Sequence, residues 1–241
     1  MAPTALQSHH PYHDRQDAGR HLAEQLAEWS HHPQGIVLAL PRGGVPVGWE
    51  IAHALHLPLD VLIVRKIGHP GQPELAVAAI ATGDATVINH SIAADIPQAV
   101  DYLEPAIACA KKKLRRREGL FRGDRPPLDL EGKEVILVDD GAATGATMRA
   151  AAQAVRLLGA ARCIATLPVA TADVCRTLKS EGTQVVCPLV PETELGEVGE
   201  YYENFPAVSD TEVRELLSRQ NADPTGDSLA LAAAFQRTGL G

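Results

Sequence analysis

Residues 135–150, VILVDDGAATGATMRA, carry the signals of a strand, a loop and a helix start in direct succession. The first four residues are aliphatic without interruption, which is typical of a parallel strand covered on both faces. This strand ends at Asp139 and Asp140, so both carboxylates are expected at its carboxyl end. The apolar spacing over 148–158 predicts a helix that stops at Gly159. A strand followed by a helix in this way is the building unit of an α/β sheet.

The loop between this strand and helix suits a phosphate. None of its side chains is larger than Thr, so backbone N–H groups can approach a ligand, and the positive end of the helix faces the same space. The preceding acidic pair would not help a pure phosphate site, but carboxylates accept hydrogen bonds from ribose hydroxyls. We therefore expect a phosphorylated ribose. Its phosphate would be held by Gly141, Ala142, Ala143, Thr144, Gly145, Ala146 and Thr147.

The stretch VILVDDGAATGATM resembles the phosphoribosyl pyrophosphate signature of the type I phosphoribosyltransferases. The resemblance implies an enzyme that moves the phosphoribosyl group of phosphoribosyl pyrophosphate to a nitrogen base and releases pyrophosphate. It also implies Mg²⁺, held mainly by the substrate with Asp139 and Asp140 nearby. These carboxylates would orient the ribose and tolerate its growing positive charge. Ala143 stands where hypoxanthine-guanine members have an acidic residue, so this loop offers no direct protonation of a purine.

A second strand is predicted over 35–40, GIVLAL, and a short turn with one charge follows it. Ligands collect outside the carboxyl ends of an open parallel sheet, so Arg42 should share one crevice with the acidic pair. Its guanidinium can hold two phosphate oxygens, while Gly43 and Gly44 offer unobstructed N–H groups. The resemblance assigns this turn to the pyrophosphate loop. It also implies a strained peptide bond within the turn Pro41-Arg42-Gly43, with the cis form among the options.

A third strand is predicted over 59–64 and ends at Arg65 and Lys66, which should add positive charge to the crevice. Residues 68–74, GHPGQPE, resemble the mobile loop of the family. Closure of such a loop would exclude water from a reactive sugar cation. Glu74 is the only carboxylate in it, and either a catalytic or binding role or a solvated position is open to it.

Two other stretches each allow two interpretations. Aromatic residues make up only 4% of the chain, yet they cluster in 198–205, VGEYYENF. Tyr201 and Tyr202 would either form a hood that stacks on the base or pack the end of the domain. The run KKKLRRR, 111–117, lies near the end of a helix predicted over 96–121. It is either a solvated face favoured by the helix dipole or a patch for phosphates or RNA.

Composition limits the class of protein. With 45% hydrophobic and 22% charged residues, the chain of 241 residues is typical of one globular α/β domain. No apolar run is long enough to span a bilayer, and the first fifteen residues lack a signal-peptide pattern, so we expect a cytoplasmic protein without a membrane partner. A net charge of −8 argues against general nucleic-acid binding. The four widely spaced cysteines predict reduced, buried thiols.

The alternation of strands and helices predicts a doubly wound, mostly parallel sheet of the type I phosphoribosyltransferase kind over 14–217, with a small hood within 190–217. Residues 1–13 are expected to be a mobile lead, with metal binding by its histidines as the alternative, and 218–241 a loosely ordered tail. A homodimer is an option that the sequence leaves open. So is a sensor of the same fold that binds the nucleotide or phosphoribosyl pyrophosphate without catalysis and regulates RNA or a protein partner.

Overall fold

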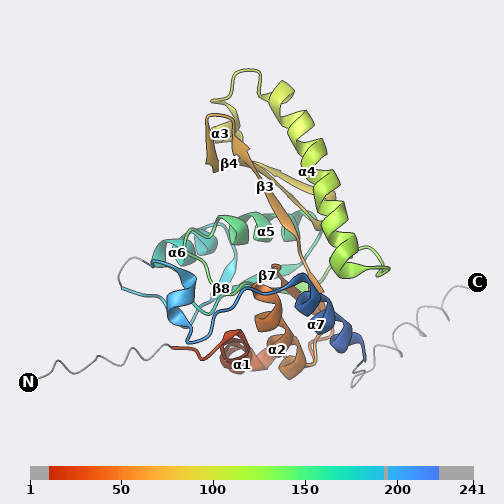
Figure 1. The fold of residues 1–241 in the computed structure, drawn as a ribbon, viewed down its shortest axis with the longest axis vertical. Helices are drawn as coiled ribbons and strands as arrows, with labels where there is room; N and C mark the ends of the chain where they lie inside the picture. Colours follow the sequence, from red (N-terminus) through yellow and green to blue (C-terminus); the bar gives the residue numbers. More distant parts are fainter. Residues whose placement is uncertain (1–10, 193–194, 223–241) are drawn as a thin grey trace, which may run out of the picture.

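A five-stranded parallel sheet forms the centre of the computed structural model, which describes residues 11–192 and 195–222 (Figure 1). The predicted doubly wound parallel sheet is confirmed. The strands other than the last one are mostly buried because helices cover both faces, which explains their aliphatic runs. In spatial order they are β2 (Leu59–Val61), β1 (Gly35–Ala39), β6 (Glu134–Val138), β7 (Arg162–Thr166) and β8 (Gln184–Val186).

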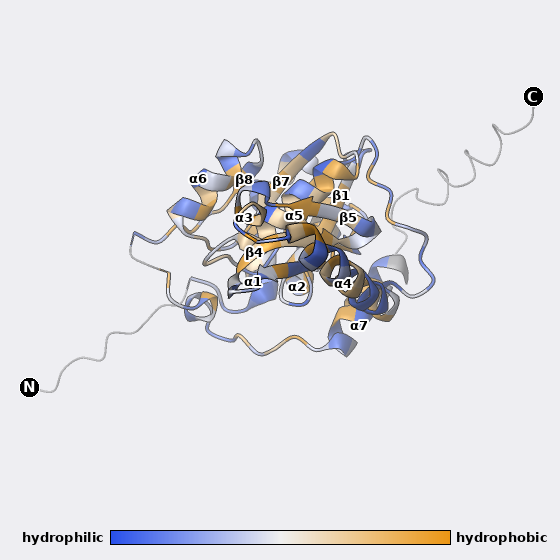
Figure 2. Cartoon of the chain, turned by 90° about the horizontal axis from the view of Figure 1, so that it is seen from above, coloured by the Kyte–Doolittle hydropathy of each residue, from blue (hydrophilic) through white to orange (hydrophobic). Residues whose placement is uncertain are grey.

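Alternate side chains of the central strand enter two different cores. Ile136 and Val138 join the cluster on one face of the sheet, whereas Val135 and Leu137 join the cluster on the other. Figure 2 shows the hydrophobic residues gathered toward the centre, where helices and sheet meet. The first cluster is packed by α1 (Arg15–Gln25), α2 (Gly44–Leu55) and α7 (Asp210–Ala222), and the second by α5 (Ala146–Leu157) and α6 (Ala172–Ser180).

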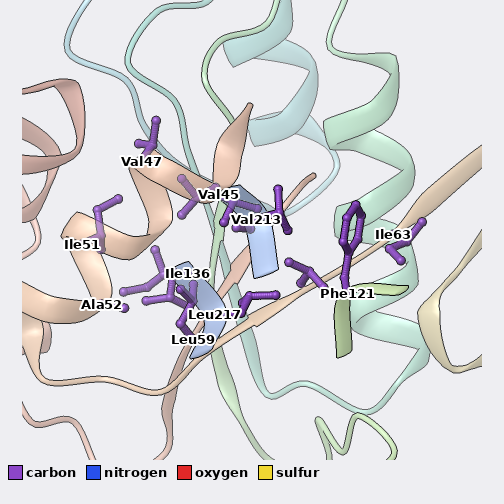
Figure 3. Close-up of a cluster of buried hydrophobic side chains, with 14 of the residues drawn as sticks. Val45, Val47, Ile51, Ala52, Leu59, Ile63, Phe121, Ile136, Val213 and Leu217 are labelled. Atoms are coloured by element: carbon purple, nitrogen blue, oxygen red, sulfur yellow. The ribbon is translucent and has the colours of Figure 1, made fainter. Parts of the chain in front are cut away.

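The first cluster also ties the sheet to the rest of the molecule (Figure 3). Ile51 of α2, Ile136 of β6 and Leu217 of α7 gather there with Phe121, which comes from a helix outside the central sheet. These side chains are almost fully buried, so the contact is part of the core. The same helix is held by a buried ion pair, in which Arg122 Nη2 lies 3.0 Å from Asp60 Oδ2 at the end strand β2.

A second, antiparallel sheet projects from this body and was not expected as a separate unit (Figure 1). It consists of β3 (Val64–His69), β4 (Gln72–Ala81) and β5 (Ala85–Ile88), followed by α3 (His90–Ala93) and α4 (Ala99–Arg122). The single strand predicted over 59–64 is wrong, because the chain leaves the parallel sheet after Val61. The three short 3₁₀ helices are η1 (Ala27–Trp29), η2 (Thr82–Asp84) and η3 (Val198–Tyr201).

The prediction of a loop over 68–74 is also wrong, since most of this stretch belongs to the hairpin of β3 and β4. Its Gly residues serve the pairing. A Cβ on Gly68 would lie 2.2 Å from the carbonyl oxygen of Pro73, so only glycine lets the two strands approach there. The pairing register shifts next to this residue, as in a β-bulge.

Both predicted domain boundaries need adjustment. Residues 1–10 and 223–241, which include His9 and His10, lie outside the described residues. Tyr12 is only 5% exposed and packs with Tyr202, so the expected lead does not extend through residue 13. At the other end α7 continues to Ala222, because Leu216 and Leu217 are buried against the core. In the stretch expected to hold the hood, the described residues contain η3 and the start of α7.

The structure places three of the four cysteines as expected and one differently. All four thiols are free. Cys163 and Cys175 are buried and Cys187 is partly buried, but Cys109 is exposed on α4, so the expectation of a buried thiol is wrong there. The reason is that Cys109 faces away from the sheet that α4 covers, while the next residue, Ala110, faces the core. Among the described helices, none is long and apolar enough to cross a bilayer.

Candidate active site

The carboxyl ends of three strands bring the predicted site loops together. In the parallel register Ala39 pairs with Val138, and Val138 pairs with Thr166. One residue further on, the backbone N–H of Leu40 donates to the carbonyl of Val138 at 2.8 Å. The turn with Arg42 and the acidic pair are therefore direct neighbours, as the strand pattern predicts.

Gly43 and Gly44 make this contact possible. A Cβ on Gly43 would lie 1.9 Å from Asp140 Oδ2, and one on Gly44 would lie 2.6 Å from the carbonyl oxygen of Val138. Real Cβ atoms do not approach other atoms so closely, so any side chain here would displace the turn or the acidic pair. The peptide bond between Pro41 and Arg42 is cis, which confirms that form of the prediction.

Arg42 itself is about half exposed at the edge of this crevice, with its Nη1 3.8 Å from Asp210 Oδ1 at the start of α7. Asp210 is shared with α4, because Arg117 donates to both of its carboxylate oxygens at 2.8 and 3.2 Å. The guanidinium of Arg42 thus has one long ion-pair contact and keeps most of its donors for another anion.

The two carboxylates of the acidic pair lie in different surroundings. Both are partly buried. Burial raises the pKa of Asp139 well above its usual range, and the neighbouring charge of Asp140 raises this pKa further. Asp139 Oδ1 accepts a hydrogen bond from the backbone N–H of Asp140 at 3.0 Å, while Asp140 has an ion pair with Arg15, whose Nε lies 2.8 Å from Oδ2.

Arg15 is a site residue that the sequence analysis missed. It lies 125 residues before its partner, in a helix that looks like an ordinary surface helix. One signal was present: Arg15 is the first residue of α1, where the helix dipole disfavours a positive charge. A cation at that position suggests a partner elsewhere in the fold.

The predicted phosphate loop lies between β6 and α5. Ala143 and Thr144 are exposed and Thr147 is partly exposed, so ligand atoms can reach them. Gly145 has φ 66° directly before α5, and its Cβ would lie 2.7 Å from Val174 Cγ1. The fold by itself therefore requires glycine at this position. The loop is anchored on the next crossover, since the N–H of Ala142 donates to the carbonyl of Val169 at 2.9 Å.

The prediction that Arg65 and Lys66 stand at a strand end is wrong, because both residues lie inside β3. Successive strand residues point to opposite faces, so the two charges separate. Lys66 pairs with Ala79 and borders a cavity of about 450 Å³. The cavity is also lined by the first turn of α5, next to the phosphate loop. Arg65, in contrast, pairs with Ile80 on the opposite face of the strand, which α4 covers. Only Lys66 remains a candidate for the crevice.

Two further cavities have different relations to the site. One of about 490 Å³ is lined by Ala143 and Thr144 of the phosphate loop together with the start of α6. Another, of about 560 Å³, lies beside Trp29 and Thr183, at the start of β8. It is far from the candidate site, because the site loops follow the carboxyl ends of the strands.

Tyr202 supports the acidic pair. It is 2% exposed, its ring packs against Tyr12 and Phe205, and its hydroxyl donates to the main-chain carbonyl of Asp140 at 2.6 Å. Burial raises the pKa of this hydroxyl, so it stays a neutral donor. Of the two interpretations of the aromatic cluster, packing fits Tyr202, while Tyr201 is partly exposed.

Two other predicted elements remain open. Glu74 lies within β4, and its side chain is outside the described part of the structure. In the basic run, Arg115 pairs with Asp84 and Arg117 with Asp210, whereas Lys112 is exposed. The described residues contain no group of three or more His, Cys, Asp or Glu side chains that could hold a metal ion.

Comparison with known proteins identifies the family. Residues 10–203 match the phosphoribosyl transferase domain family. A Mycobacterium tuberculosis H37Rv protein named as a candidate phosphoribosyl transferase, Rv0571c, is 40% identical over 216 residues, covering 88% of this chain and 47% of that protein. This chain thus spans about half the length of that curated relative. The crystal structure of TT1426 from Thermus thermophilus is 39% identical with a TM-score of 0.78, covering 87% of this chain and 98% of the other. The chain belongs to the phosphoribosyl transferase domain family.

Proposed function

We propose that the protein transfers the phosphoribosyl group of phosphoribosyl pyrophosphate to a nitrogen base. The observation that carries the proposal is the contact between two loops: the turn of Gly43 lies directly on the carboxylate of Asp140. Groups suited to pyrophosphate and groups suited to a ribose diol thus meet at the carboxyl ends of two neighbouring strands. The small-residue loop after them supplies a third subsite, for the 5′-phosphate.

The reaction follows from the charges at these subsites. The bond from carbon 1 of the ribose to the pyrophosphate oxygen breaks, and its electron pair leaves with pyrophosphate. A ring nitrogen of the base bonds to carbon 1, and the proton of that nitrogen passes to solvent water. Arg42, Lys66 and the backbone N–H of Gly43 would hold the leaving anion, whereas the N–H of Gly44 already donates to the carbonyl of Leu40 at 3.0 Å. Asp139 and Asp140 would face the sugar as it becomes cationic.

Mg²⁺ fits the donors in this region. Carboxylate and phosphate oxygens are the ligands that this ion prefers, and it seldom needs a dedicated protein cage. Pyrophosphate oxygens would supply most of the ligands of the ion, with Asp139 and Asp140 nearby. When bound, the ion would neutralise charge on the leaving group.

The test is a screen of the purified chain against nitrogen bases, with phosphoribosyl pyrophosphate and Mg²⁺ present and pyrophosphate release as the readout. We expect turnover with at least one base. Binding of phosphoribosyl pyrophosphate without turnover on any base would instead support a sensor that uses the same pocket. Failure to bind it at all would refute the proposal.

A further inference from the structure

We propose that Arg15 is a positioning residue, which orients Asp140 toward the ribose and offsets the crowded negative charge of the acidic pair. This inference rests on the proposed function. It assigns a role in the site to the start of α1, which is far from the acidic loop in the sequence.

Three contacts hold the guanidinium of Arg15 in one orientation. Its Nε donates to Asp140 Oδ2 at 2.8 Å, and its Nη1 donates to the carbonyl oxygen of Pro206 at 2.7 Å. The guanidinium carbon also lies 3.6 Å from the ring centre of Phe205. Only 7% of the residue is exposed, so neighbouring groups surround the side chain. Both its direction and its charge are therefore set before a ligand arrives.

Arg15 and Gly43 approach the same oxygen of Asp140. The Cβ position of Gly43 is 1.9 Å from Oδ2, the atom that Arg15 contacts. Oδ2 is thus enclosed by the glycine turn on one side and the guanidinium on the other. Arg15 donates to Oδ2 of Asp140 and not to Oδ1. Oδ1 is therefore the better acceptor for a ribose hydroxyl. A carboxylate held in this way cannot rotate away from the sugar.

The main chain of Asp140 is fixed by the same part of the molecule. The hydroxyl of Tyr202 donates to its carbonyl at 2.6 Å, and Tyr202 packs on Tyr12, three residues before Arg15. The segments 12–15 and 202–206 therefore hold Asp140 in place from outside the sheet. Neither segment reaches the site through a neighbouring strand, which distinguishes this support from ordinary sheet packing.

Charge gives the second part of the role. Two adjacent carboxylates repel each other, and burial disfavours their ionised forms. Both effects raise the pKa of Asp139, and the positive charge of Arg15 lowers it. Without Arg15 the pKa of Asp139 would therefore be higher. Asp139 would then present less negative charge to a sugar carbon that becomes positive in the transition state.

The decisive experiment compares Arg15→Gln and Arg15→Lys with the parent. The matched control is Arg20→Gln, which removes an exposed arginine of the same helix whose ion pairs, at 3.6 Å, lie outside the site. Turnover and binding of phosphoribosyl pyrophosphate are measured from pH 5 to pH 9. Carboxyl carbon NMR of the ligand-free proteins gives the titration of the acidic pair directly.

For Arg15→Gln we expect kcat to fall at least tenfold while binding weakens less. We also expect the acidic limb of the pH profile and the carboxyl titration to move to higher pH. Arg15→Lys should restore the titration but only part of kcat, because an ammonium cannot reproduce the fixed fork. Arg20→Gln should behave like the parent.

A folded Arg15→Gln protein with unchanged titration and turnover would overturn the inference. So would a lower melting temperature and lower activity with the acidic limb and titration unmoved, because that pattern describes a purely structural residue. A parent protein that is inert toward phosphoribosyl pyrophosphate would refute the proposed function alone, and the NMR titration would then still decide the role of Arg15.

Discussion

Replacement of Gly43 by Ala tests the contact between the two site loops with a single methyl group. Gly43 has φ −61° and ψ −35°, which Ala adopts freely, so the backbone itself would not be strained. The new Cβ, however, would lie 1.9 Å from Asp140 Oδ2 and 2.5 Å from its Cγ. Ordinary van der Waals contact begins near 3.4 Å, so one partner must move by roughly 1.5 Å.

The size of the effect follows from what can move. Displacing Asp140 would break its charge-assisted hydrogen bond with Arg15, worth about 1.5–3 kcal/mol, and overpacking of this kind costs about 1–3 kcal/mol. The two costs are alternatives, so we expect a loss of about 1–3 kcal/mol in the free energy of unfolding. A misplacement of about 1 Å can lower turnover on the order of 100-fold. Activity should therefore suffer far more than stability.

The assay combines urea unfolding with pyrophosphate release in the presence of the best base. Gly119→Ala is the matched control, because a Cβ there, on helix α4, would meet nothing within 4 Å. That substitution should stabilise the helix by up to about 1 kcal/mol and leave turnover unchanged. If Gly43→Ala folds and turns over like the parent, the close approach of the two loops has no part in the chemistry.

Three further predictions concern the acidic pair and the phosphate loop. Asp140→Asn should lower turnover by orders of magnitude but weaken binding less, as pre-steady-state kinetics and calorimetry would show; a loss of turnover no larger than the loss of binding would contradict a role for this carboxylate in the transition state. Burial raises the pKa of Asp139, so the folded protein loses stability as the pH rises from the ordinary aspartate pKa through this raised value. Asp139→Asn should therefore raise the melting temperature at pH 7.5 and not at pH 4, and an equal gain at both would contradict the assignment. Thr144→Val should weaken ribose 5-phosphate binding about 5–10-fold without lowering the melting temperature; it is a cleaner test than Gly145→Val, which would meet Val174, and unchanged affinity would move the phosphate elsewhere.

Local patterns in the sequence were sufficient to predict where the main loops of the candidate site lie. The buried strand that ends at Asp139, the small-residue loop and the helix after it are contiguous, and so are the strand and glycine turn around Arg42. Hydrophobic period, turn residues and helix ends act over a few neighbouring residues. For that reason the fold class and the two loops at the carboxyl ends of the strands could be predicted before the structure was known. The cis form of a peptide bond in the turn 41–43 was one option implied by the family resemblance and not by these local patterns.

The hairpin shows where such patterns fail. Two glycines and two prolines over 68–74 predict a loop, yet the chain pairs with itself there and needs Gly68 for the close approach of its strands. The exit from the parallel sheet after Val61 then sends Arg65 and Lys66 to opposite faces. Which face a side chain takes depends on strand register, and register is set by partners that are distant in the sequence.

Sequence alone determined that this chain builds a parallel sheet with an acidic pair and a small-residue loop at its carboxyl edge. Only the tertiary structure decided how that pair is held. Arg15, 125 residues away, and Tyr202, 62 residues away, meet at Asp140 because α1 and the segment before α7 cover the same end of the sheet. A hydrophobic pattern specifies that a helix packs on a sheet, but the energy of an ion pair depends on distances that exist only after packing.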